Sequence, residues 1–129
     1  MADRLERILY VEDEPDIQMV AKLALEMMGG FTLSVCSSGA EALERVAEFK
    51  PQLLLLDVMM PGMDGPTTLK RLRELGQTAQ TPAVFMTAKV QPGEIAQYKA
   101  LGAVDVIPKP FDPMGLANEV RAIWEKCHG

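Results

Sequence analysis

The chain has 129 residues, of which 48% are hydrophobic and 24% charged, and these values are those of an ordinary globular domain rather than a disordered chain. Its net charge of −5 disfavours direct binding to nucleic acid, and no apolar stretch approaches the roughly 18 residues that a membrane span requires. Because the first residues also lack the apolar segment of a secretory signal, we expect one cytoplasmic domain covering residues 1–129.

Short apolar runs alternate with stretches of helical periodicity along the whole chain. Four predicted strands cover 8–11, 53–56, 83–86 and 104–107, and a further strand ends at Cys36. The first predicted helix begins near Pro15 and stops at Gly29. Its apolar face consists of Ile17, Val20, Ala21, Ala24, Leu25 and Met28.

Four more helices are predicted after the later strands. Ser38 is expected to cap the second helix with Glu41 as its capping-box partner, Gly65 opens the third helix and Pro92 opens the fourth. The apolar positions of these helices are Leu43, Val46, Ala47, Leu69, Leu72, Leu75, Ile95, Tyr98, Leu101, Leu116, Val120, Ile123, Trp124 and Cys127. Five strands alternating with five helices predict an α/β fold, a doubly wound parallel sheet covered on both faces.

Four of the predicted strands end in side chains suited to one phosphate and metal site. These are Glu12 and Asp13 after the first strand, Asp57 after the third, Thr87 after the fourth and Lys109 in the turn after the fifth. Ligands of open α/β sheets bind beyond the carboxyl ends of the strands. If the order is 2-1-3-4-5, as in flavodoxin-like sheets, these four strands are neighbours and their end residues converge.

The residue types indicate phosphoryl transfer with a hard cation. Glu12, Asp13 and Asp57 would place three negative charges in one cleft, which requires a cation. Oxygen ligands without Cys or His favour Mg²⁺ or Mn²⁺ over zinc. Asp57 could attack phosphorus, while Thr87 and Lys109 could hold phosphoryl oxygens.

Each candidate has an ordinary structural explanation when it is taken alone. Glu12 and Asp13 could be acids at a helix N-terminus, Asp57 a turn residue, Thr87 a cap and Lys109 a solvated charge. His128, the only histidine, is next to last and is expected to be solvated. It is the combination at one sheet end that favours a functional site.

Four segments of the sequence, 9–15, 53–65, 84–89 and 107–113, resemble those of response-regulator receiver domains, in the same order across essentially the whole chain. This resemblance implies a cytoplasmic phosphorylation switch of a two-component system. Asp57 would accept a phosphoryl group from a histidine kinase or histidine phosphotransfer protein, and a downstream protein would read the change. A second copy of the chain is a further candidate partner, in a homodimer that forms on phosphorylation.

The resemblance also assigns roles to the other site residues. Asp13, Asp57 and the backbone carbonyl of Met59 would bind Mg²⁺, and Glu12 would assist through water. Thr87 would hydrogen-bond the phosphoryl group, and Lys109 would pair with it. A cis peptide bond between Lys109 and Pro110 is implied as well.

Two residues near the fifth strand depart from the family pattern. Val106 stands where receiver domains usually carry a switching Tyr or Phe, so a signal that depends on ring burial is not expected. We expect instead that residues 87–102 move and that the surface of the fourth helix, fifth strand and fifth helix binds the partner. Pro108 fits an edge strand, because proline cannot donate to a sheet ladder.

Two alternatives to a dedicated switch remain open. An Mg-dependent phosphatase with an aspartyl nucleophile would usually carry a second acid at the position of Met59, which counts against it. A scaffold with a vestigial site is less consistent with the complete set of acid, Thr and Lys residues. The residues also leave open whether the receiver stands alone or is a fragment of a larger regulator or hybrid kinase.

Overall fold

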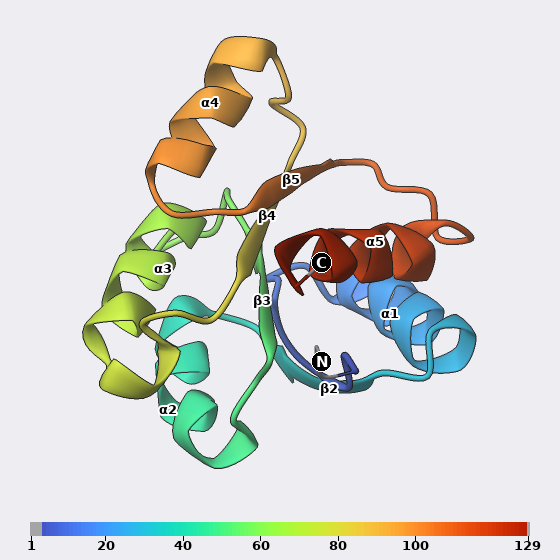
Figure 1. Ribbon diagram of the computed structural model, residues 1–129, viewed down its shortest axis with the longest axis horizontal. Coiled ribbons are helices and arrows are strands. Elements are labelled where there is room, and N and C mark those ends of the chain that lie inside the picture. Colours follow the sequence, from blue (N-terminus) through green and yellow to red (C-terminus); the bar gives the residue numbers. More distant parts are fainter. Residues whose placement is uncertain (1–3, 129) are drawn as a thin grey trace.

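A five-stranded parallel sheet forms the centre of the protein, and helices cover both of its faces (Figure 1). The computed structural model describes residues 4–128, without the side chain of His128, so the expected solvation of that side chain lies outside the described residues. The strands are β1 (Arg7–Val11), β2 (Thr32–Cys36), β3 (Leu53–Asp57), β4 (Ala83–Thr87) and β5 (Asp105–Pro108). Their order is β2-β1-β3-β4-β5 and every pairing is parallel, which confirms the predicted doubly wound fold.

Five α-helices alternate with the strands, as the periodicity predicted. They are α1 (Pro15–Leu23), α2 (Gly39–Phe49), α3 (Gly65–Glu74), α4 (Pro92–Ala100) and α5 (Leu116–His128). Two short segments were not predicted, a π-helical continuation of α1 named η1 (Ala24–Met28) and a 3₁₀ turn named η2 (Gly76–Thr78). Among residues 4–128, no helix is long and apolar enough to cross a membrane.

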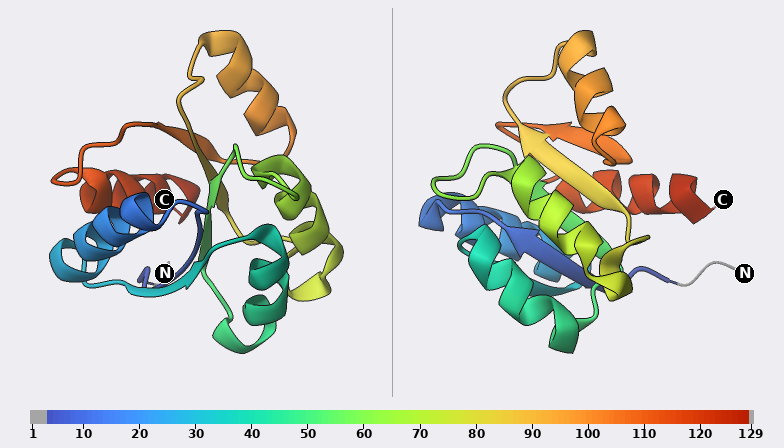
Figure 2. Two further views of the ribbon diagram at one scale, coloured as in Figure 1. Left: turned by 180° about the vertical axis from the view of Figure 1, so that it is seen from behind. Right: turned by 90° about the vertical axis from the view of Figure 1, so that its left-hand side faces the viewer.

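Two hydrophobic cores lie on opposite faces of the sheet. The two views of Figure 2 place α1 and α5 on one side of the sheet and α2 and α3 on the other. The four leucines at 53–56 of β3 are fully buried and alternate between these cores. A central parallel strand is covered on both faces, and this is why the run is continuously apolar rather than alternating.

The predicted helix faces are right at their centres and wrong at several borders. Val20 and Met28 of the first helix are exposed, and so are Ala47 and Cys127. The π-helical turn of η1 advances the chain with more residues per turn, so a period of 3.6 no longer places Met28 on the buried face. The helical pattern therefore located the helices more reliably than the limits of their buried faces.

The cap of α2 follows the prediction only in part. The hydroxyl of Ser38 accepts a hydrogen bond from the backbone N–H of Glu41 at 3.1 Å, as expected. The Glu41 carboxylate accepts from the N–H of Ser37 at 2.6 Å, one residue before the predicted capping-box donor. The side chain thus satisfies a backbone donor in the turn that leads into α2.

The helix α4 lies against the edge of the sheet and contributes little to the hydrophobic cores. None of its described residues 92–100 is buried. Tyr98 is its main apolar contact, packing partly buried against the core on the α3 side, with its ring 5.5 Å from that of Phe85 in an edge-on arrangement. The predicted packing role of Tyr98 is confirmed, whereas Leu101, predicted to share its face, is exposed.

Candidate functional site

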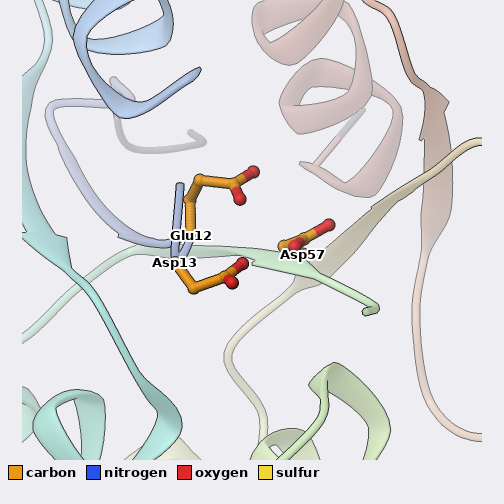
Figure 3. Close-up of side chains that lie close together, drawn as sticks. All are labelled: Glu12, Asp13 and Asp57. Atoms are coloured by element: carbon orange, nitrogen blue, oxygen red, sulfur yellow. The ribbon is translucent and has the colours of Figure 1, made fainter. Parts of the chain in front are cut away.

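The predicted site residues lie at the carboxyl ends of neighbouring strands. Figure 3 shows the side chains of Glu12 and Asp13, from the turn after β1, beside that of Asp57, the last residue of β3. One carboxylate oxygen from each of the three lies within 4.8 Å of the others. The sheet therefore brings Asp57 to two acids that precede it by 44 and 45 residues in the chain.

Backbone hydrogen bonds hold these strand ends in place. The N–H of Glu12 donates to the carbonyl of Cys36 at 3.0 Å, which extends the β1–β2 ladder into the site. The N–H of Val58 donates to the carbonyl of Met86 at 3.0 Å and fixes the end of β3 against β4. Because each acid adjoins a paired backbone group, the carboxylates start from fixed positions rather than from a free loop.

Lys109 pairs with two of the three acids, Glu12 and Asp57. Its ammonium nitrogen lies 3.0 Å from Oδ1 of Asp57 and 3.1 Å from Oε1 of Glu12. The N–H of Lys109 donates to the carbonyl of Thr87 at 2.9 Å, which anchors the residue just beyond β5. The Lys109–Pro110 peptide bond is cis, as the resemblance implied. The alternative explanation of Lys109 as a solvated loop charge is thus excluded.

Burial dominates the electrostatics of the acidic cluster. Glu12 has no exposed surface, and burial raises its pKa to about 7 although the hydrogen bond from Lys109 works in the opposite direction. Burial also raises the pKa of Asp57, again against the effect of Lys109. The pKa of Lys109 itself is raised, because its bonds to Asp57 and Glu12 outweigh the cost of burying its charge.

This charge balance fits a divalent cation. Three carboxylates lie together and a single ammonium group pairs with two of them, so when all are ionised the site carries an excess of two negative charges. The converging donors are oxygens, and no histidine or thiol joins them in the cluster formed by the described residues. Such a donor set suits Mg²⁺ or Mn²⁺ rather than zinc.

Thr87 and Met59 lie at the same end of the sheet but are less directly engaged. The buried Thr87 hydroxyl accepts a hydrogen bond from the N–H of Lys89 at 3.1 Å, so its own proton is free to donate elsewhere. Met59 lies two residues beyond Asp57 and is 68% exposed. Any contribution of Met59 to the site must therefore come from its backbone.

Gln18 is a contact of the site that the sequence did not reveal. Its side-chain amide donates to the backbone carbonyl of Glu12 and to the hydroxyl of Ser37, the latter at 3.0 Å. These bonds connect the first turns of α1 to the turns after β1 and β2. A glutamine on a helix border carries no local signal of such a role, because the contact depends on the sheet that brings the two turns together.

Val106, which departs from the family pattern, lies close to the contact between α4 and the sheet. Val106 pairs in register with Phe85 of β4, and the Phe85 ring contacts Tyr98 of α4. Residues paired across parallel strands point to the same face of the sheet. Val106 therefore faces the same side as the Phe85–Tyr98 pair, but it supplies no ring there. Pro108 ends β5, the edge strand, as predicted.

Comparisons of the sequence agree with this geometry. The family model for the response regulator receiver domain matches residues 8–121. The transcriptional regulatory protein CpxR of Escherichia coli (strain K12) is 40% identical over 124 residues, which cover 96% of this chain and 51% of that protein. The DNA-binding response regulator MtrA of Mycolicibacterium smegmatis is 37% identical over 117 residues, which cover 91% and 50%. The chain thus spans about half the length of these relatives.

The fold is also that of a solved chemotaxis protein. The chemotaxis response regulator CheY4 of Vibrio cholerae superposes with a TM-score of 0.85 at 27% sequence identity. The match covers 93% of this chain and 99% of that one. The similarity extends over the whole sheet and its helices rather than over the site alone.

Proposed function

Since this chain belongs to the family of response-regulator receiver domains, we propose that it is switched by phosphorylation of Asp57. A histidine kinase or a histidine phosphotransfer protein would supply the phosphoryl group. A carboxylate oxygen of Asp57 attacks phosphorus, the new O–P bond forms, and the P–N bond of the phosphohistidine breaks. The departing imidazole nitrogen keeps the electron pair and takes up a proton. The ionised Asp57 carboxylate carries no proton to lose, so its attack needs no general base.

The observation that supports this proposal best is the joint position of Asp57, Glu12 and Lys109. Asp57 is held at the end of a central strand, 3.0 Å from the ammonium group of Lys109, which can pair with an incoming phosphoryl oxygen. Glu12 shares the same ammonium at 3.1 Å. On phosphorylation, Lys109 can keep a bond to the modified Asp57 and compensate part of the added negative charge.

The cation would be Mg²⁺, with Mn²⁺ as a substitute. Asp13, Asp57 and the Met59 carbonyl would hold it, and Glu12 would assist through water. When bound, Mg²⁺ neutralises charge on the carboxylates and the phosphoryl group and so allows two anions to approach. Asp13 is the partly exposed member of the three acids, which leaves the cluster accessible from solvent at that side.

Thr87 offers the route by which phosphorylation would change the surface. Its hydroxyl can donate to a phosphoryl oxygen while it continues to accept from Lys89, so a movement of Thr87 pulls the loop that leads into α4. None of the described residues of α4 is buried, and the partly buried Tyr98 is its contact with the core on the α3 side. We therefore expect residues 87–102 to shift and the surface of α4, β5 and α5 to bind a downstream protein or a second copy.

The setting of this switch is proposed to be the cytoplasm, where histidine kinases expose their phosphohistidine. The names of two relatives refer to transcriptional regulation and DNA binding, but this chain spans only about half of each. Its net charge of −5 disfavours contact with a phosphate backbone. We therefore propose that the receiver itself contacts proteins and that any contact with nucleic acid belongs to another part of such regulators.

The runner-up function is an Mg-dependent phosphatase that uses Asp57 as its nucleophile. Incubation with acetyl phosphate and Mg²⁺ separates the two functions, with phosphate release followed over time. A switch takes up one phosphoryl group per chain and releases it slowly. Rapid release of phosphate over many turnovers, from acetyl phosphate and also from phosphate monoesters, would instead support the phosphatase.

A further inference from the structure

Gly65, the first residue of α3, is packed directly against the backbone of the proposed phospho-acceptor. A Cβ atom at this position would lie 2.4 Å from the carbonyl oxygen of Asp57 and 2.9 Å from the Cα of Val58. Both are backbone atoms at the end of a central strand, and Val58 is also bonded to Met86 of β4 at 3.0 Å. A side chain at Gly65 could therefore be accommodated only if α3 or the end of β3 moved.

Close approach is the reason for a glycine here, rather than backbone conformation. The described glycines with a left-handed φ are Gly30, Gly62 and Gly102, and Gly65 is not among them. Gly65 could accommodate an L side chain conformationally, but there is no space for one. The absence of a side chain thus sets how closely the start of α3 can approach Asp57.

The same residue closes the loop that follows the phospho-acceptor strand. The N–H of Gly65 donates to the carbonyl of Val58 at 2.9 Å, so the loop 59–64 is joined at its base. Asp64 caps α3 by accepting from the N–H of Thr67 at 2.9 Å, which fixes the first turn of the helix. The position of the whole loop therefore depends on the contact of Gly65 with β3.

We propose that Gly65 is a positioning residue of the phosphorylation site. Its missing side chain lets α3 lie on the backbone of Asp57, and this contact holds loop 59–64, including the Met59 carbonyl, at the distance that the cation requires. The inference rests on the proposed function, since it concerns the same cation site. It predicts that filling the space at Gly65 weakens cation binding although no ligand is removed.

The test compares three glycine-to-alanine variants of the full chain by their affinity for Mg²⁺. Gly65→Ala should raise the dissociation constant for Mg²⁺ by about tenfold, the size of effect typical of residues that orient metal ligands. Gly93→Ala is the neutral control, because its Cβ would meet no described atom within 4 Å. Gly29→Ala is the destabilised control, because its Cβ would lie 2.7 Å from the Leu25 carbonyl at the far end of the first helix.

Mg²⁺ binding is followed by amide chemical shifts on samples shown to be folded by circular dichroism. Both controls should bind like the wild type. Unchanged affinity of Gly65→Ala would overturn the positioning role, as would an equal loss in Gly29→Ala, which would trace the effect to general instability. If the wild type and Gly93→Ala also fail to bind Mg²⁺, the proposed site itself is wrong.

A measurement on the wild type covers the case in which Gly65→Ala does not fold. If Mg²⁺ binds only when the base of loop 59–64 is joined, it favours that state. It then suppresses opening of the hydrogen bond from the Gly65 N–H to the Val58 carbonyl. Hydrogen exchange of the Gly65 amide should therefore slow when Mg²⁺ is raised to saturation. Exchange that stays at the same rate in bound and free protein would overturn the proposal.

Discussion

The buried carboxyl group of Glu12 should make the stability of the protein depend on pH. Burial raises its pKa from 4.5 to about 7. The folded protein therefore keeps this proton up to about neutral pH, whereas the unfolded chain loses it near pH 4.5. The stabilisation from the proton is fully present below pH 4.5 and is lost as the pH rises to about 7, and the difference between the two pKa values corresponds to about 3 kcal/mol.

Urea unfolding without divalent cations, at a series of pH values from 4.5 to 7.5, measures this effect. The free energy of unfolding of the wild type should fall toward pH 7 relative to that of Glu12→Gln, which is neutral at every pH. The matched control is Glu44→Gln, which changes an exposed carboxylate on α2 and should leave the wild-type slope intact. Saturating Mg²⁺ should reduce the loss, because the cation favours the ionised cluster. Parallel curves for wild type and Glu12→Gln would refute the assignment of a buried, proton-binding Glu12.

Substitutions at three further positions probe separate parts of the site and the switch. Asp13→Ala should weaken Mg²⁺ binding by at least about tenfold because the cluster loses a ligand, and an unchanged titration of Trp124 fluorescence or amide shifts would contradict this role. Lys109→Ala should keep the affinity for Mg²⁺. It should lose most of the amide chemical-shift changes that beryllofluoride, a phosphoryl mimic, induces in residues 87–102. A collapse of the Mg²⁺ affinity would contradict this role of Lys109. Tyr98→Ala should lower the free energy of unfolding by about 2 kcal/mol through loss of the ring contact with Phe85, whereas Tyr98→Phe should stay near the wild type; an equal effect of both would refute the packing role.

The sheet could be predicted from the sequence because its strands are short, apolar and regularly separated. The leucines at 53–56 read as a central strand since a continuous apolar run fits burial on both faces. The strand order was adopted from known folds of this type, because local periodicity carries no information on which strands are neighbours. The candidate site followed from that order and from the residue types at the strand ends.

What escaped prediction depends on contacts between distant segments. The exposure of Val20 and Met28 follows from packing and from a π-helical turn that a regular period cannot anticipate. The contact of Gln18 with the Glu12 carbonyl and the close approach of Gly65 to Asp57 exist only once the sheet has formed. Such features arise from three-dimensional packing, and a single sequence shows only the residue types that permit them.

Intact-mass measurement of phosphorylation tests the central proposal, the role of Asp57, most directly. The wild type and Asp57→Ala are incubated with acetyl phosphate and Mg²⁺, and Asp16→Ala serves as a control that removes an exposed acid from the first turn of α1. The wild type and Asp16→Ala should gain the mass of one phosphoryl group, and Asp57→Ala should gain none. Continued addition of a single phosphoryl group to folded Asp57→Ala would contradict the assignment of Asp57 as the phospho-acceptor.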